Sequence, residues 1–163
     1  MERPFASRIT TGMTNEHEIN RWISDSRPWV FRLALAIIGQ RDAAEDAAQE
    51  AVLRASRSWR KIADADDPKA WLRRVLVRCA LDELKRNKRA PMVSERSSEI
   101  DGDSFAVRQT LNRLDASDRS LLALVHFEQL SYQEIADLLD IPVGTVGSRI
   151  SKARDSFRKE WER

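Results

Sequence analysis

Six hydroxyl or basic residues share one segment of helical spacing near the C-terminus: Thr145, Ser148, Arg149, Ser151, Lys152 and Arg154. Short polar side chains and a lysine near the start of a helix can enter the major groove of DNA, so Ser148, Ser151 and Lys152 are candidates for contacts to base edges. The other three are better placed to contact phosphates, which orient a protein on DNA without reading its sequence.

The preceding residues supply the elements that position this segment. Ser131-Tyr-Gln-Glu134 is a capping box that can begin a short helix. A turn from Ile141 to Gly144 leads into a last helix, which Thr145 can cap and which extends to Trp161. The buried stripe of that helix is Val146, Ile150, Ala153 and Phe157. Together these features predict a helix-turn-helix and favour DNA binding over an ordinary solvated helix.

A second basic surface is predicted on a helix over residues 67–89, with Asp67 as its N-cap and Pro68 in its first turn. Arg74, Arg78, Lys85 and Arg89 project within one narrow arc. Residues 69–96 hold nine basic and three acidic side chains, a local charge of +6. Local charge of this density suits a DNA backbone, because each neutralised phosphate releases counterions. A solvated helix remains the alternative.

Trp71 lies at the border between the basic and apolar sides of this helix. An aromatic ring there could stack on an unpaired base. Large aromatic residues are more often buried, so a core position is favoured for Trp71 by about two to one.

A third candidate surface is acidic and lies on a helix over residues 42–59, for which Asp42 is the expected N-cap. Its alanines share one side and predict close helix packing. The opposite side presents Asp46, Gln49, Glu50 and Leu53. An acidic patch around an exposed leucine can be a protein docking site, although composition alone would describe it as a solvated face.

Composition and motifs exclude several classes of protein and of functional site. The chain has 163 residues, 33% charged and 42% hydrophobic, which suits a soluble protein with real cores. Its single cysteine, Cys79, allows no intrachain disulfide and fits a small buried hydrophobe. The sequence shows no catalytic triad, phosphate-binding glycine loop, metal-ligand pattern or apolar run long enough for a membrane. We therefore expect no enzyme, cofactor, metal, small-molecule substrate or membrane insertion.

The chain is predicted to be all-α, with two small helical domains joined by a flexible linker. The linker is residues 91–103, PMVSERSSEIDGD, which is polar and has no helical period. The first domain is expected over 14–90, with Gly39 as a helix stop, and the second over 104–163. Residues 1–13 are expected to be a disordered tail, and Met13 is a possible biological start.

Three segments in order resemble the extracytoplasmic-function (ECF, group IV) sigma factors of bacterial RNA polymerase. They are AAEDAAQEAVLRA (43–55), WLRRVLVRCALDELKR (71–86) and LSYQEIADLLDIPVGTVGSRISKAR (130–154). The resemblance implies a sigma-two-like domain of three or four helices and a sigma-four-like helix-turn-helix domain, in a cytoplasmic protein. Arg78, Gly147 and the acidic loop Ala63 to Asp67 depart from the family pattern.

The resemblance also implies partners. The face with Asp46, Gln49 and Glu50 would dock on the clamp helices of core RNA polymerase, and the second domain would hold its flap. The minus-ten promoter element would meet Trp71 and the basic arc, and the minus-thirty-five element the last helix. Such proteins are commonly inhibited by an anti-sigma factor.

Two other functions remain open at this point. A one-component transcription regulator would share the helix-turn-helix and sense a ligand through residues 14–90. A helical interaction module would use its basic faces to bind an acidic protein.

Overall fold

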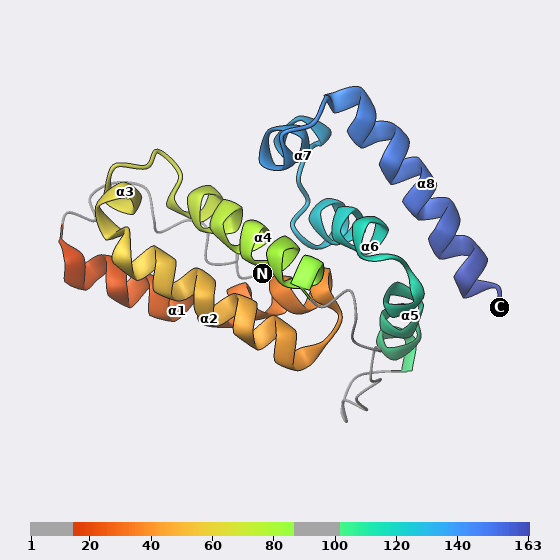
Figure 1. Cartoon of the computed structure of the whole chain (residues 1–163), viewed down its shortest axis with the longest axis horizontal. Helices are drawn as coiled ribbons and strands as arrows, with labels where there is room; N and C mark the ends of the chain where they lie inside the picture. The colour runs from red at the N-terminus through yellow and green to blue at the C-terminus, as the bar shows by residue number, and fades with distance from the viewer. Residues whose placement is uncertain (1–14, 87–101) are drawn as a thin grey trace, which may run out of the picture.

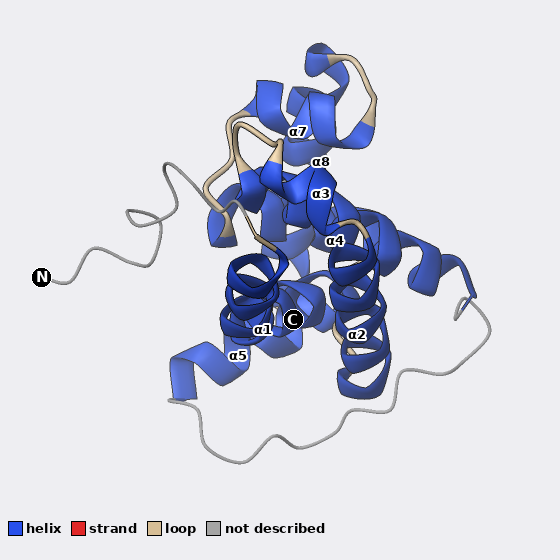
Figure 2. Ribbon diagram, turned by 90° about the vertical axis from the view of Figure 1, so that its left-hand side faces the viewer, coloured by secondary structure: helices blue, strands red, loops and turns tan. Residues whose placement is uncertain are grey.

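The computed structural model describes residues 15–86 and 102–163, and this part of the chain is helical without a strand (Figures 1 and 2). The elements are α1 (Glu16–Ile38), α2 (Arg41–Arg57), α3 (Trp59–Ala63), α4 (Pro68–Arg86), α5 (Gly102–Arg113), α6 (Ala116–Leu122), the π-helical segment η2 (Ala123–Phe127), α7 (Tyr132–Leu139) and α8 (Val143–Trp161). The all-α prediction is confirmed. The expected tail and most of the expected linker lie outside the described residues.

Helix α1 has well-defined ends. The side chain of Asn15 accepts a hydrogen bond of 2.9 Å from the Glu18 amide, which satisfies one free donor of the first turn. The helix ends at Gly39, whose φ of 80° is left-handed and whose amide donates to Leu35 O. The predicted stop at Gly39 is therefore confirmed.

Helix α2 packs its alanines against α1 and α4. Ala44, Ala51 and Ala55 are fully buried, as their shared side predicted. The expected N-cap at Asp42 is wrong, because the extended backbone of Gln40 begins the helix two residues earlier. Asp42 instead lies in the first turn, where its negative charge interacts favourably with the helix dipole.

The loop after α2 contains a short helix that the sequence pattern did not reveal. Ile62 of α3 is fully buried, and burial of this side chain explains why the segment folds back onto the core. Asp67 then caps α4 as predicted, since its Oδ1 accepts a 3.0 Å hydrogen bond from the Ala70 amide.

The helix-turn-helix is formed by α7 and α8. Ser131 and Glu134 make the predicted capping box: Ser131 Oγ accepts from the Glu134 amide, and Glu134 Oε2 accepts from the Ser131 amide. The turn is Asp140 to Pro142, not a turn containing Gly144, because Asp140 adopts a left-handed conformation and Pro142 is the N-cap of α8. Thr145 is inside α8, so its predicted capping role is also wrong.

The two blocks of helices pack together. One hydrophobic core joins Ile37 of α1 to Leu124 of η2 and Ile135 of α7. Helix α6 packs against both α1 and α8, and Figure 1 shows it between the first block and α8. The surfaces of the first block that lie under α6 and η2 are therefore covered in this conformation.

Candidate nucleic-acid interface

The outward face of α8 is formed by the residues that the sequence selected. Ser148, Arg149, Ser151 and Lys152 are exposed, and Thr145 is half-buried. Val146, Ile150 and Ala153 are fully buried beneath them, which fixes the rotation of the helix. Ser148 Oγ donates a 3.1 Å hydrogen bond to Thr145 O, so its hydroxyl is held near the N-terminal turn. The side chains of Ser148, Ser151 and Lys152 are therefore accessible together on one side of the helix.

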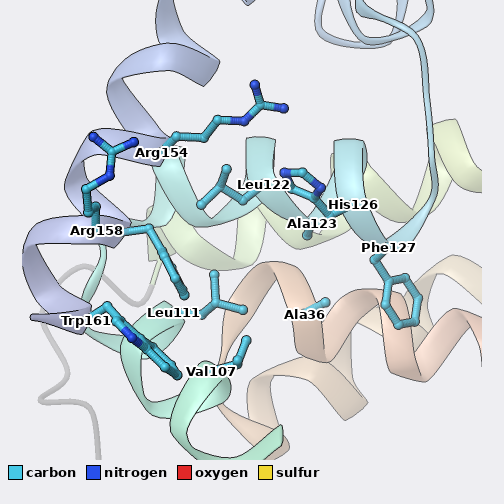
Figure 3. A pocket seen from close by; sticks show the side chains of 11 residues that line it. Ala36, Val107, Leu111, Leu122, Ala123, His126, Phe127, Arg154, Arg158 and Trp161 are labelled. Carbon is cyan, nitrogen blue, oxygen red and sulfur yellow. The ribbon is translucent and has the colours of Figure 1, made fainter. Parts of the chain in front are cut away.

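Arg154 lies on a different side of α8. It lines an apolar pocket together with Arg158, and both side chains are exposed at its edge (Figure 3). Arg154 therefore does not share the surface of Ser148 and Lys152.

The basic side of α4 presents Arg74, Arg78 and Lys85 to solvent. Lys85 is 4.0 Å from Asp82, a distance at which an exposed pair is weak. Arg89 lies outside the described residues. Arg73, which neighbours the arc, is not available, because it pairs with Glu128 of the second block.

Trp71 contacts the core and also lines a surface groove. The ring is half-buried and packs against the main hydrophobic cluster. On its open side it meets Arg54, Arg57 and Arg78 around a cavity of about 320 Å³. Three cations beside one aromatic ring suit a nucleotide, because the base can stack while a phosphate is neutralised.

The sequence reading did not select Arg54 or Arg57 for this site. Both residues belong to α2, and they reach Trp71 only because α2 and α4 pack side by side. Their position in a separate helix gave no signal in the α4 pattern. Hydrogen bonding to Glu50 raises the pKa of Arg54, which remains a cation.

The acidic face of α2 is more mixed than its sequence suggested. Asp46 and Gln49 are exposed, and Leu53 is 49% exposed. Glu50 forms a 2.6 Å ion pair with Arg54, so its charge is partly offset. A groove of about 470 Å³ runs beside Gln49, Val52 and Leu53. A polar rim around an exposed leucine and an adjacent groove suits a protein partner.

A further apolar surface lies between α5, η2 and α8. Val107, Leu111 and Trp161 line a pocket of about 760 Å³, and Ala36 of α1 forms part of its floor (Figure 3). Phe127 and Trp161 are nearly half exposed. Contiguous exposed apolar surface of this kind marks an interaction site.

Cys79 is buried, and burial raises the pKa of its thiol. A protonated, inaccessible thiol is poorly suited to redox chemistry. Within residues 15–86 and 102–163, no group of three or more His, Cys, Asp or Glu side chains could hold a metal ion. None of the helices in those two ranges is long and apolar enough to cross a membrane.

Two family profiles match the chain, one to each block. The profile "Sigma-70 region 2" matches residues 22–90, and "Sigma-70, region 4" matches residues 104–156. The chain is 30% identical over 152 residues to the RNA polymerase sigma-H factor of Pseudomonas aeruginosa, which covers 80% of this chain and 79% of that protein. It is also 30% identical over 133 residues to the ECF RNA polymerase sigma factor SigM of Mycobacterium tuberculosis, covering 77% and 67%.

Solved structures share the fold. The sigma factor RpoE from Bartonella quintana, in complex with the anti-sigma factor NepR, aligns with a TM-score of 0.69 at 20% identity, over 89% of this chain and 97% of that one. CnrH, in complex with the cytosolic domain of CnrY, aligns with a TM-score of 0.61 at 21% identity, over 90% and 88%.

Proposed function

This chain belongs to the ECF-type RNA polymerase sigma factors, and on that premise we propose that it binds core RNA polymerase and directs transcription initiation at specific promoters. Its place within group IV of the sigma factors is part of the proposal. So is its action in the cytoplasm, where RNA polymerase works. The chain would act by binding, and the chemistry of RNA synthesis would belong to the polymerase.

The single observation that carries this proposal is the presence of two separate DNA-suited surfaces and one docking face in a chain of 163 residues. The α8 face is formed by one helix of the second block, the Trp71 groove by α4 together with the C-terminal end of α2, and the docking face by α2 alone. A one-component regulator needs the first surface only. A promoter-opening factor needs all three, because it must hold the polymerase, bind duplex DNA and capture an unpaired strand.

The proposed roles follow from these surfaces. Residues 14–90 would form the domain that docks on the polymerase clamp helices and opens the minus-ten element. Residues 91–103 would be the linker, of which 102 and 103 lie in the first turn of α5, and 104–163 would be the domain that reads the minus-thirty-five element. Docking would use Asp46, Gln49, Glu50 and Leu53. Minus-ten contacts would use Trp71, Arg74, Arg78, Lys85 and Arg89, and minus-thirty-five contacts Thr145, Ser148, Arg149, Ser151, Lys152 and Arg154.

Capture of a flipped base explains how binding can open DNA. An unpaired base that stacks on Trp71 beside Arg54 and Arg78 would be stabilised only in the melted state. The favourable contact therefore shifts the equilibrium toward strand separation without any catalytic group.

A regulatory partner is also proposed. The apolar pocket beside Val107, Phe127 and Trp161 has no covering element in the described part of the chain, and its rim carries Arg154 and Arg158. The polymerase flap or an anti-sigma factor would bury this surface. The similar RpoE structure was solved with an anti-sigma factor bound, which supports such regulation here.

Transcription in vitro tests the proposal. Core polymerase, the purified chain and DNA from upstream of its own gene are expected to give discrete transcripts that require the chain. A parallel pull-down measures polymerase binding directly. Absence of both transcripts and polymerase binding would reject the proposal. Tight, specific binding of the promoter by the chain alone would favour a one-component regulator instead.

A further inference from the structure

The two domains are joined by a buried carboxylate at the start of the loop after η2. Glu128 Oε1 accepts a 2.7 Å hydrogen bond from Trp29 Nε1 of α1, and Glu128 Oε2 accepts a 2.8 Å hydrogen bond from Arg73 Nε of α4. The side chain of Glu128 is only 4% exposed and that of Arg73 only 14%. Each carboxylate oxygen therefore has a donor from a different helix of the first domain.

The local backbone aims Glu128 at those helices. The amide of Glu128 donates to Ala123 O, five residues back, which is the wider turn of a π-helix. Gln129 follows with a φ of 54°, a left-handed conformation that is costly for a residue other than glycine. This sharp end of the helix points the Glu128 side chain toward α1 and α4 instead of solvent.

A second contact joins the domains at the end of α1. Arg119 of α6 is 3% exposed and donates to Ile37 O at 2.8 Å and to Ile38 O at 2.6 Å. These carbonyls belong to the last turn of α1, where the helix dipole favours a cation. Burial lowers the pKa of Arg119, yet the guanidinium remains charged in this position.

Gly39 allows Arg119 to come close to the end of α1. A Cβ placed there would lie 2.6 Å from Asn112 Oδ1 and 3.2 Å from Arg119 Cζ, both in the second domain. The absence of a side chain at residue 39 thus matters for the domain interface as well as for the left-handed helix end.

We propose that Glu128, Arg73, Trp29 and Arg119 form an intramolecular latch that holds the free chain closed and inactive toward promoters. This inference rests on the proposed function. The minus-ten and minus-thirty-five elements are about 25 base pairs apart, which is about 85 Å along B-DNA. In the latched state α4 and the residue after η2 are in direct hydrogen-bonding contact, so the two domains cannot reach both elements together.

The latch also removes a cation from the DNA-binding side. Arg73 adjoins Arg74 of the basic arc, and its ion pair with Glu128 cancels its charge toward phosphate. The latch contacts themselves are polar, and their charged groups regain hydration when the domains separate. The interface also includes the shared apolar cluster of Ile37 and Leu124, so opening exposes apolar surface as well. Binding to the larger surface of the polymerase would have to offset that cost.

The first test measures the distance between the domains in the free, full-length chain. Spin labels on Asp25→Cys and Glu162→Cys, in a Cys79→Ala background, report domain separation by pulsed electron resonance. The wild-type chain is expected to give one dominant distance, that of the closed state. Glu128→Arg places a cation against Arg73, and we expect the ratio of open to closed chains to rise about tenfold or more.

Matched variants separate the latch from general damage. The charge swap Arg73→Glu with Glu128→Arg is expected to restore the closed-state distance in part, because the ion pair re-forms but a guanidinium at position 128 cannot accept from Trp29 Nε1. His126→Ala, an exposed change on the preceding turn, is expected to leave it unchanged. Gly39→Ala is expected to open the chain without altering any charge. Circular dichroism confirms that each variant is folded. A wild-type chain that is already open, or an unchanged distance in both opening variants, overturns the latch.

The second test asks whether the latch inhibits. At limiting core polymerase, Glu128→Arg is expected to form promoter complexes severalfold faster than the wild type, and the charge swap to move the rate back toward that of the wild type. Equal or slower complex formation by an open variant that still binds polymerase overturns the inhibitory role. Failure of every variant and of the wild type to bind polymerase instead rejects the proposed function, and the distance measurement still decides whether the latch exists.

Discussion

Helices α8 and α4 are both proposed to meet DNA, but they present their contacts in different ways. The face of α8 consists of residues from one helix, and Ser148, Ser151 and Lys152 are exposed together. The basic side of α4 is a composite surface. Arg54 and Arg57 of α2 lie beside Trp71 and form part of its groove. Arg73 forms an ion pair with Glu128, the residue after η2, so its charge does not contribute to this surface.

This difference has a physical cause. A helix that enters a groove needs only an exposed face and a buried stripe, both of which repeat with the helical period. A site for an unpaired base needs a ring with neighbours on several sides, and one helix cannot surround its own side chain. The α4 site therefore depends on packing in a way that the α8 face does not.

The largest expected effect comes from reversing a charge on the exposed face of α8. Lys152→Glu is expected to reduce promoter-specific transcripts by about a hundredfold, because it replaces a donor with a charge that repels phosphate. Polymerase binding should be unchanged. Lys159→Glu, also exposed but two turns further along α8, is the matched control and should have a much smaller effect. Loss of polymerase binding in the Lys152 variant would contradict the separation of the two roles.

A second test asks whether the α2 face is independent of both DNA surfaces. Asp46→Arg with Glu50→Arg is expected to weaken polymerase affinity about tenfold, since it reverses the charge of the docking face. Asp25→Arg with Glu162→Arg makes the same number of reversals at exposed positions elsewhere. Pull-down or titration with labelled core polymerase compares the two. Equal affinity for both double variants removes the docking role.

Trp71→Ala tests whether the composite site binds a base. Loss of one stacking contact is expected to slow promoter opening about fivefold to tenfold. A template with an already unpaired bubble should largely restore the rate, while Trp71→Phe should retain most of it. If Trp71→Ala lowers the free energy of unfolding by about 3 kcal/mol or more and opening of the folded fraction is normal, Trp71 is a core residue only.

The smallest expected effect is on the stability contributed by the capping box of α7, the helix that packs against α8. Ser131→Ala removes the hydroxyl of the capping box and is expected to lower stability by about 1 kcal/mol near neutral pH, measured by urea unfolding. Exposed Gln133→Ala, on the same turn, is the control.

The difference in stability between the wild type and Ser131→Ala is expected to depend on pH. Hydrogen bonds from the Ser131 amide and hydroxyl lower the pKa of Glu134 in the folded chain. A lowered folded pKa contributes stability above the unfolded pKa of the carboxyl group, and this contribution is lost as pH falls through the folded value. The gap between wild type and Ser131→Ala should therefore narrow in acid. A gap that widens in acid contradicts the capping role of Glu134.

Local sequence motifs predicted several helix ends correctly where the residues involved lie close together in one helix. The capping box, the Asp67 cap and the Gly39 stop are confirmed, because each depends on residues within a few positions of one another. The predicted caps at Asp42 and Thr145 are wrong, since the backbone of Gln40 and Pro142 begins those helices earlier. The short α3 and the π-helical turn of η2 gave no periodic signal of their own.

The sequence by itself determined the two helical blocks, the division of the last helix into a buried and an exposed face, and the family resemblance. These features depend on helical periodicity and short motifs, and both are properties of contiguous residues. Only the tertiary structure shows which cations lie beside Trp71 and that Glu128 neutralises Arg73. It also shows that a side chain at residue 39 would clash with Asn112 and Arg119. Glu128 and its partners Trp29 and Arg73 are 99 and 55 positions apart, and only the packing of one domain on the other brings their charges and hydrogen bonds together.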